Sequence, residues 1–551
     1  MALLPTDTKH ILIVPAAMWG HFRPLLHLGI NLLTLHPDLR ATFLITPSIA
    51  PRLEKDLEQL VADLTIGTTP VAERLQTIIC VPKGSDASRE FKAEDMGKEV
   101  VEFASVMPEI ISGLYDANYN SNGTLNKFEG LPPSLVLYDM FQTFVPDIMV
   151  STLESLNITV PPLVMFAPCS PASVYHLFGP EEKGGSFARL TRLAEEDIAM
   201  GVDPIEAYAK YAFRGTGQVL PLPGLPAKFD YEWWPHKDTV PISGHVVSAC
   251  IPALKAFLHK NTVAIAIAFA GELESEAVSA LEEVFSDKTI YTVGPQFPEE
   301  MWEGDFSVKA GSDDDKRVIA FLDQMKEKHG SNSVCYIRYR LLTLAWPSTN
   351  APSPSFGSLF FPIFRPELIR YILSTLQETG VPFVFAYASG IAPVPIELIE
   401  EFAGLEDACF VKFAPQWAVL KHPATGFFLT HCGSNSTHET ITAKVPIVSM
   451  PFAADQGQIA SLLTDVLHVG IDLKQTKTFI NPPFNKLYDG TVIEGTESAI
   501  KDEMRTVWKR MKGKEGEEMR VRMGEVKERL RKSFNDGRGK QDMIKLGECR
   551  L

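Results

Sequence analysis

The residues best suited to chemistry form one block near the carboxyl end of the chain. An apolar run at 426–430 is followed by His431-Cys432-Gly433-Ser434-Asn435-Ser436, which predicts a strand and a turn that opens a helix. A helix start leaves about four backbone N–H groups without internal partners and carries a partial positive charge. Gly433 lets a bound group approach the backbone, and Ser434, Asn435 and Ser436 can donate to phosphate oxygens or cap the helix. The block predicts an anion site, with an ordinary N-cap as the alternative.

Residues on both sides of this turn suit one ligand. Before it, Phe413 and Gln416 offer an aromatic face and an amide, which suit stacking on a nucleobase and pairing with it. After it, Glu439 on the new helix suits ribose hydroxyls, while Asp455 and Gln456 suit the hydroxyls of a sugar. The chain therefore meets a base, a ribose, a diphosphate and a sugar in that order.

In this order, residues 413–456 resemble the donor-binding signature of the family 1 UDP-sugar-dependent glycosyltransferases, particularly the plant and fungal small-molecule type. The resemblance implies that Phe413 and Gln416 hold the uracil, Glu439 the ribose, His431, Gly433, Asn435 and Ser436 the diphosphate, and Asp455 and Gln456 the transferred sugar. Three residues depart from the family pattern. Phe413 stands in place of a usual tryptophan, Ser434 in place of the tryptophan of plant members, and Lys444 in place of a customary glycine.

A histidine near the amino terminus extends the resemblance. Residues 10–15 predict a short buried strand, and Gly20-His21-Phe22-Arg23-Pro24 leads into a helix that continues through Leu35. The exit of a first strand is where open α/β sheets bind ligands. The family's general base stands at this position, which implies that His21 removes the proton from an acceptor hydroxyl. A capping or structural histidine is the alternative.

The resemblance also implies an acidic partner for His21, and the match is Asp139 at the end of a predicted strand over 134–138. Such an acid holds the imidazole ring and stabilises the imidazolium that forms. Asp139 as a cap of the following helix, and Asp147 as the acid instead, are the alternatives. The implied reaction is an inverting displacement, in which the acceptor oxygen attacks the anomeric carbon and UDP leaves toward the helix start at Ser436.

This mechanism needs no metal ion or other cofactor besides the UDP-sugar co-substrate. One segment, Asp313-Asp314-Asp315, has the Asp-x-Asp spacing that metal-dependent glycosyltransferases of another fold use. It follows Ser312 and precedes a helical pattern, so it indicates a capped, acid-rich first helical turn.

The elements that must position these residues alternate between strand and helix, which indicates parallel sheets. The resemblance implies an α/β fold of GT-B architecture, two Rossmann-like parallel-sheet domains that face each other across a cleft. We expect an acceptor-binding domain at 1–285, a UDP-sugar-binding domain at 286–525 and a tail at 526–551. The predicted strands of the first domain are 11–15, 41–46, 77–81, 135–138 and 162–166, and those of the second are 289–293, 334–337, 383–387, 408–412, 426–430 and 447–450.

One segment interrupts the second domain. The family's strand at 333–337 usually runs directly into a Phe-Gly-Ser turn near the donor phosphates, here Ser355-Phe356-Gly357-Ser358, but residues 338–354 separate the two. Their prolines cannot continue a central strand. We interpret the segment as a retained intron in the gene model, with a genuine loop beside the donor site as the alternative. If it is translated, Ser358 could be displaced and the protein inactive.

Composition excludes several classes of function. The length of 551 residues predicts two or more domains, and a net charge of −16 without a basic stripe argues against nucleic acid as a partner. Seven cysteines without a Cys-x-x-Cys pair, no signal peptide and no long apolar run indicate a cytoplasmic protein without a membrane span. We also expect a monomer.

The predicted function is transfer of a hexose or pentose, from UDP-glucose or UDP-xylose, to a hydroxyl of a lipophilic small molecule such as a terpenoid. A UDP-sugar-binding protein without turnover is the alternative, and a dinucleotide oxidoreductase is disfavoured because no Gly-x-Gly-x-x-Gly follows the first strand. The residues expected to rim the acceptor side of the cleft, each of which could equally pack in the core, are Trp19, Phe22, Met140, Phe141, Phe166 and Tyr175.

Overall fold

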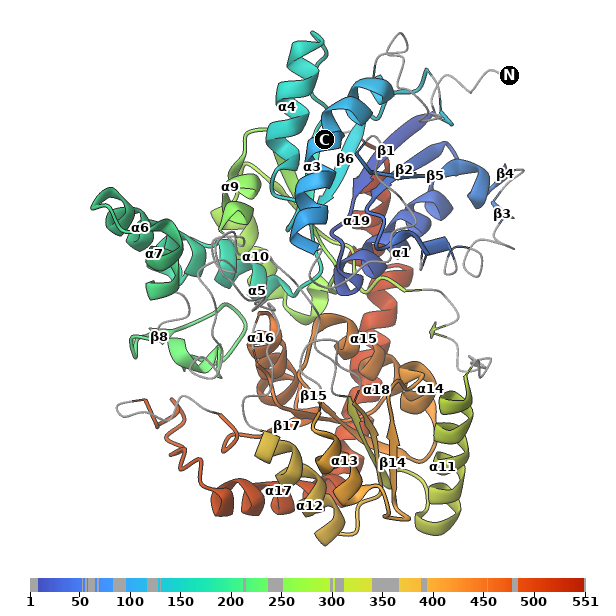
Figure 1. Ribbon diagram of the computed structural model, residues 1–551, viewed down its shortest axis with the longest axis vertical. Coiled ribbons are helices and arrows are strands. Elements are labelled where there is room, and N and C mark those ends of the chain that lie inside the picture. The colour runs from blue at the N-terminus through green and yellow to red at the C-terminus, as the bar shows by residue number, and fades with distance from the viewer. Residues whose placement is uncertain are drawn as a thin grey trace.

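The computed structural model consists of two lobes, each built around a parallel sheet (Figure 1). The two sheets are covered by helices, and most strands are buried on both faces, as is typical of parallel sheets, whereas edge strand β5 exposes alternate residues. The structure describes residues 8–51, 53, 54, 57, 65, 66, 69–82, 96–115, 127, 128, 130–211, 215–235, 251–297, 301, 302, 312–338, 366–387, 394–452, 454–477 and 484–549.

The first lobe contains a seven-stranded parallel sheet in the order β11-β10-β7-β6-β1-β2-β5. Its strands are β1 (Lys9–Val14), β2 (Leu39–Ile45), β5 (Leu75–Ile79), β6 (Leu135–Asp139), β7 (Leu163–Ala167), β10 (Thr262–Ile267) and β11 (Thr289–Thr292). Its helices are α1 (Trp19–Leu35), α3 (Met96–Tyr115), α4 (Val145–Ser155), α5 (Pro171–Phe178), α6 (Ser186–Ala199), α7 (Pro204–Tyr211), α9 (Pro252–Leu258) and α10 (Ser275–Val284). Two small antiparallel pairs, β3 (Thr65–Ile66) with β4 (Thr69–Pro70) and β8 (Val219–Leu220) with β9 (Lys228–Phe229), lie outside this sheet.

The second lobe contains a six-stranded parallel sheet in the order β14-β13-β12-β15-β16-β17. Its strands are β12 (Val334–Arg338), β13 (Phe383–Ala386), β14 (Ala408–Val411), β15 (Thr425–Thr430), β16 (Ile447–Ser449) and β17 (Gly470–Asp472). Its helices are α11 (Asp313–His329), α12 (Pro366–Glu378), α13 (Ile396–Phe402), α14 (Gln416–Lys421), α15 (Ser434–Ala443), α16 (Gln456–Ser461) and α17 (Glu497–Lys512).

The predicted domain boundary at residue 286 is wrong. The strand predicted at 289–293 was assigned to the second sheet, but β11 pairs with β10 and is the edge strand of the first sheet. A short apolar run does not reveal which sheet it joins, because that depends on pairing between segments distant in sequence. The prediction also missed β10 and β17.

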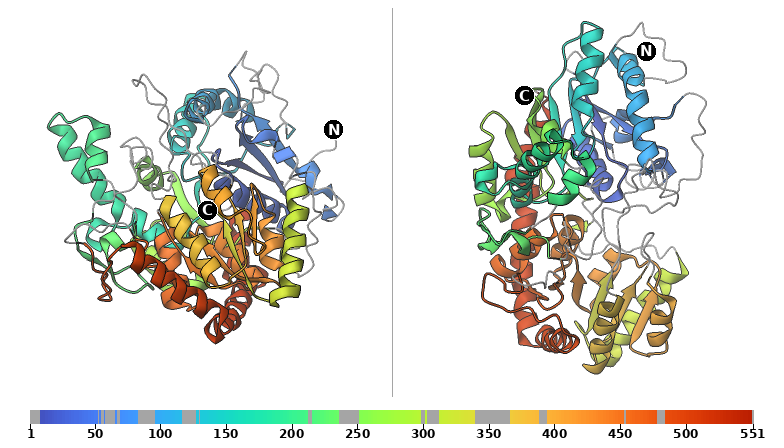
Figure 2. Two further views of the ribbon diagram at one scale, coloured as in Figure 1. Left: turned by 60° about the horizontal axis from the view of Figure 1, so that its bottom comes forward. Right: turned by 60° about the vertical axis from the view of Figure 1, so that its left-hand side comes forward.

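The carboxyl-terminal segment is not a separate tail from residue 526. Helix α18 (Lys514–Asn535) runs through that boundary, and α19 (Arg538–Gly547) returns to the first lobe (Figures 1 and 2). There Asp542 Oδ2 accepts a hydrogen bond of 2.8 Å from the backbone N–H of Thr292 in β11. Helices α18 and α19 therefore connect the second lobe to the first.

Two further expectations can be compared with the structure. Ser312 is the N-cap of α11 and forms a capping box with Asp315, which confirms the capped, acid-rich turn predicted at 313–315. Within the described ranges, no helix is both long and apolar enough to cross a bilayer.

The backbone conformation of Lys444 explains why glycine is favoured at this position. It ends α15 in the left-handed conformation, with φ of 60°, where a Cβ atom costs about 1–2 kcal/mol. We therefore expect Lys444→Gly to raise the free energy of unfolding by about 1 kcal/mol in urea denaturation. Lys444→Ala is the matched control, since it removes the same charge and keeps the Cβ. A glycine variant no more stable than the alanine variant would contradict the prediction.

Candidate active site

The candidate site lies where the carboxyl ends of the two sheets meet. Helix α1 follows β1 and presents its first turn to α15, which follows β15 of the other lobe (Figure 1). A contact between Asn435 Nδ2 and the backbone oxygen of Gly20, at 2.8 Å, spans the two lobes here. The topology therefore brings together the two regions that the sequence singled out, more than 400 residues apart.

The structure brings His21 and Asp139 together as predicted. His21 Nδ1 lies 2.9 Å from Asp139 Oδ2 and 3.1 Å from Oδ1. Asp139 is fully buried at the end of β6, and its Oδ1 also accepts the backbone N–H of Phe141, whose ring lies 4.7 Å from the imidazole. With the Nδ1 proton donated to Asp139, Nε2 is the basic atom of the ring. This arrangement can orient an imidazole for proton removal.

The two alternatives for Asp139 do not fit the structure. Helix α4 has Phe144 as its N-cap, so Asp139 does not cap it. The side chain of Asp147 is 87% exposed on α4, and its Oδ1 lies 4.0 Å from Nε2 of another histidine, His259. Of the two acids, only Asp139 contacts His21.

The small-residue turn has the predicted form. Gly433 is the N-cap of α15, and a Cβ there would lie 2.8 Å from His431 Nε2, which explains the absence of a side chain. Burial, together with the charge of Arg338, lowers the pKa of His431 to about 4. The ring is therefore neutral near pH 7 and can offer an N–H donor rather than a positive charge.

The predicted uracil and ribose residues are linked in one network. Gln416, at the start of α14, accepts from Arg338 through Oε1 and donates to Glu439 Oε2 through Nε2. Its Nε2 also lies 3.4 Å from Ser436 Oγ. Phe413, three residues before Gln416 in the sequence, is 65% exposed and is therefore accessible for stacking.

Two members of this network were missed by sequence reasoning. Arg23 donates to Glu439 Oε1 at 2.7 Å from the first turn of α1, and Arg338 ends β12. Arg23 stands two residues after His21, but no local pattern places it near Glu439. Arg338 was assigned to the interrupting segment; the structure shows it as the last residue of the central strand β12. The remainder of that segment, with Ser358, lies outside the described residues.

Asp455 and Gln456 open α16 on the same side of the cleft. Burial raises the pKa of Asp455 to about 7, and a backbone hydrogen bond within Asp455, the charge of His21 and a backbone hydrogen bond of Ser434 partly offset this rise. Gln456 is buried, and its Oε1 accepts the backbone N–H of Phe452 at 2.8 Å.

The residues expected to rim the acceptor side divide into two groups. Phe22 and Phe166 are fully buried and belong to the core, as does Met140. Trp19 and Phe141 are partly exposed near the cleft. Tyr175 is largely buried but borders a cavity of about 960 Å³ together with residues of α6 and Trp234.

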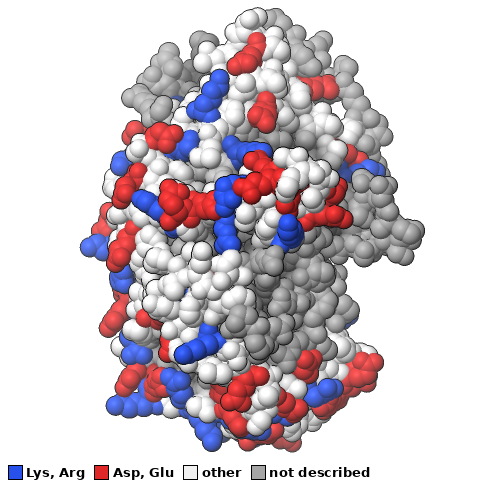
Figure 3. All heavy atoms as spheres, turned by 90° about the vertical axis from the view of Figure 1, so that its left-hand side faces the viewer, with Lys and Arg blue, Asp and Glu red and all other residues white. Residues whose placement is uncertain are grey.

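The face that carries α6 and α7 shows no single sign of charge. Lysines and arginines there are interspersed with aspartates and glutamates (Figure 3). Arg192 pairs with Glu181 at 2.6 Å and with Glu196 at 3.0 Å on this side. Among the described residues, no three His, Cys, Asp or Glu side chains are grouped so as to hold a metal ion.

Comparison with known proteins agrees with this geometry. Residues 354–476 match the family model described as "UDP-glucoronosyl and UDP-glucosyl transferase". This part of the chain is therefore similar to the UDP-glycosyltransferases. The match begins at Pro354, the last residue of the interrupting segment, and includes the donor residues from Phe413 to Gln456.

Individual proteins similar to this chain come from a fungus and a plant. The UDP-glycosyltransferase eriJ of Hericium erinaceus is 28% identical over 299 residues, 52% of each chain. A flavonol 3-O-glucosyltransferase of Arabidopsis thaliana is 30% identical over 296 residues, 51% of this chain and 53% of its own. The chain thus matches about half the length of these curated relatives.

A solved structure shows the fold. A UDP-glucosyltransferase from Polygonum tinctorium superposes with a TM-score of 0.61 at 21% identity, over 99% of both chains. The two parallel-sheet lobes are those of the GT-B fold, as expected from the sequence.

Proposed function

We propose that this protein is an inverting UDP-glycosyltransferase that moves a hexose or pentose from a UDP-sugar to a hydroxyl of a lipophilic small molecule. The observation that carries the proposal is the contact of 2.9 Å between His21 and buried Asp139, in the cleft that also holds the turn at Gly433. The family match and the fungal and plant relatives support the class of reaction.

In the proposed mechanism, Phe413 stacks on the uracil, Gln416 pairs with it and Glu439 accepts the ribose hydroxyls. The diphosphate lies at the start of α15, where backbone N–H groups, neutral His431 and the side chains of Asn435 and Ser436 can donate to it. These donors would stabilise the negative charge that develops as UDP leaves, and we propose that they do so without a metal ion.

His21 would take the proton of the acceptor hydroxyl through Nε2, and that oxygen would attack the anomeric carbon from the side opposite the diphosphate. Asp139 would hold the ring and stabilise the imidazolium. Asp455 and Gln456 would orient the sugar. We further propose UDP-glucose or UDP-xylose as the donor, an acceptor such as a terpenoid, and a monomer that acts in the cytoplasm.

The test is acceptor-dependent release of UDP. Purified protein is incubated with UDP-glucose, UDP-xylose, UDP-galactose or UDP-glucuronate and a panel of hydroxylated terpenoids, sterols and phenolics. We expect UDP release to depend on an acceptor, and the product to show inversion at the anomeric carbon by NMR. A retained anomeric configuration would contradict the mechanism.

A second candidate is a UDP-sugar-binding protein without turnover. It is favoured by one observation, the segment that separates β12 from the predicted phosphate residue Ser358. This candidate predicts that calorimetry detects UDP binding while no acceptor releases UDP. A variant without residues 339–354, which keeps Arg338 at the end of β12, would then recover transfer, because the strand again leads directly into the Phe-Gly-Ser turn.

A further inference from the structure

Two contacts join the first turns of α1 and α15 across the cleft. Asn435 Nδ2 donates to the Gly20 backbone oxygen at 2.8 Å, and Arg23 donates to Glu439 Oε1 at 2.7 Å. Gly20 and Arg23 are three residues apart on α1, while Asn435 and Glu439 are four apart on α15, so each pair lies on one face of its helix. The two contacts therefore join one face of α1 to one face of α15. Through them, Asn435 and Glu439, which both belong to the proposed donor site, bind to the first lobe.

The carboxylate of Glu439 has protein partners on both oxygens. Oε1 accepts from Arg23, and Oε2 accepts from Gln416 Nε2. The Glu439 side chain is 8% exposed, so its charge depends on these partners rather than on water. Any ligand hydroxyl that donates to Glu439 must share or displace one of them.

We propose that Arg23 competes with the donor ribose for Glu439 and thereby lowers the affinity of the cleft for the nucleotide. The inference rests on the proposed function, in which Glu439 holds the ribose. A ribose hydroxyl is a neutral donor, whereas the guanidinium is a charged donor that binds a carboxylate more strongly. Arg23 therefore tunes donor affinity through its contact with Glu439.

The surroundings of Arg23 make its release from Glu439 costly. Its guanidinium also contacts Met301 Sδ at 3.8 Å, and a thioether is a weak acceptor. The side chain is 27% exposed, so water can hydrate it only in part. The nucleotide thus gains less from Glu439 while the arginine is present.

The experiment compares uridine and UDP as probes by titration calorimetry of the full chain. In Arg23→Met, Glu439 loses its charged partner, so both ligands should bind about tenfold more tightly. Arg23→Lys keeps the charge on a different donor geometry and should lie between the wild type and the methionine variant. It also keeps the test valid if the methionine variant does not fold.

The matched control is Arg370→Met. Arg370 also pairs with a glutamate, Glu401 at 2.9 Å, but on the surface of the second lobe. This variant should bind uridine and UDP as the wild type does.

Three results would overturn the inference. Unchanged or weaker uridine binding in Arg23→Met excludes competition at Glu439. Weaker UDP binding with unchanged uridine binding assigns Arg23 to the diphosphate instead. If the wild type does not bind UDP, the proposed function itself is overturned. The wild-type titration is measured before any variant, so this failure is distinguished from a failure of the inference about Arg23.

Discussion

Replacing His21 by alanine is expected to lower kcat for sugar transfer by about 10²–10⁴-fold, because the acceptor hydroxyl loses its general base. UDP affinity should change by less than about twofold, because the donor contacts proposed above come from other residues. Steady-state kinetics with the best acceptor and calorimetry with UDP measure the two quantities. Equal losses of UDP binding and of transfer would show that His21 supports the fold or the donor site rather than the chemistry.

Asp139 provides a second variant with a close control. Asp139→Asn should reduce kcat to a similar degree, because an amide does not stabilise the imidazolium and can hold the wrong tautomer. Asp147→Asn makes the same chemical change at an exposed acid that lies 4.0 Å from another histidine, and should leave kcat unchanged. Comparable losses in both variants would contradict the assignment of Asp139.

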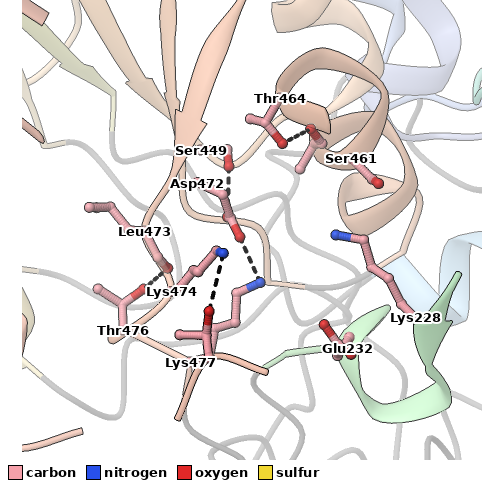
Figure 4. A network of polar contacts seen from close by, with 12 residues as sticks. Lys228, Glu232, Ser449, Ser461, Thr464, Asp472, Leu473, Lys474, Thr476 and Lys477 are labelled. Carbon is pink, nitrogen blue, oxygen red and sulfur yellow. Dashed lines mark hydrogen bonds and ion pairs between the residues drawn. The ribbon is translucent and has the colours of Figure 1, made fainter. Parts of the chain in front are cut away.

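Replacing Lys477 by methionine is expected to lower the free energy of unfolding by about 3–5 kcal/mol. Lys477 Nζ lies 2.7 Å from Asp472 Oδ2, with side-chain exposures of only 6% and 12% (Figure 4). Ser449 Oγ donates to the other oxygen of Asp472 at 2.8 Å. Without Lys477, a buried carboxylate at the end of β17 loses its nearest positive charge.

The pKa values of this pair give the pH range of the effect. Burial opposes both charged forms, but mutual attraction prevails, so the pKa of Asp472 is lowered and that of Lys477 is raised. The stabilisation by Asp472 is present above its unfolded pKa, about 4, and is lost at lower pH. That of Lys477 is present below its unfolded pKa, about 10.4, and is lost as the pH rises through the higher folded value. Near neutral pH the pair stabilises the fold fully.

Urea denaturation at pH 7, followed by tryptophan fluorescence, measures the loss. Lys474→Met is the matched control, because Lys474 pairs with Asp489 at an exposed position and its removal should cost less than about 1 kcal/mol. Replacing both members, as Asp472→Leu with Lys477→Met, should recover much of the stability, since no unpaired charge remains. A Lys477→Met variant within about 1 kcal/mol of the wild type would contradict the prediction.

Near the Asp472–Lys477 pair, the two lobes are joined both by an ion pair and by close backbone packing. Lys228, from β9 of the first lobe, lies 2.8 Å from Asp465 and contributes to the lowered pKa of Asp472. Gly457 of α16 packs against the backbone of Trp233. A Cβ at position 457 would lie 2.2 Å from the backbone oxygen of Trp233, so only glycine fits there. The network therefore connects the second sheet to a hairpin of the first lobe beside α16.

The sequence alone predicted the local structure of the donor block. The residues from His431 to Ser436 and the helix after them are local, so strand, turn and helix could be predicted together with the roles implied by the family. The pairing of His21 with Asp139 was also predicted, because both follow parallel strands and such strands end at one edge of the sheet.

Only the tertiary structure decided which segments distant in sequence share a sheet or a contact. The sheet to which edge strand β11 belongs could not be predicted, because a short apolar run does not indicate which strand it pairs with. The contact of Arg23 with Glu439 joins residues 416 positions apart and depends on how the two lobes close. The hydrogen bond between Asp542 of α19 and Thr292 of β11 likewise joins residues far apart in the sequence. Local patterns encode elements and cap geometry, whereas these contacts arise from the packing of complete lobes, which no local pattern contains.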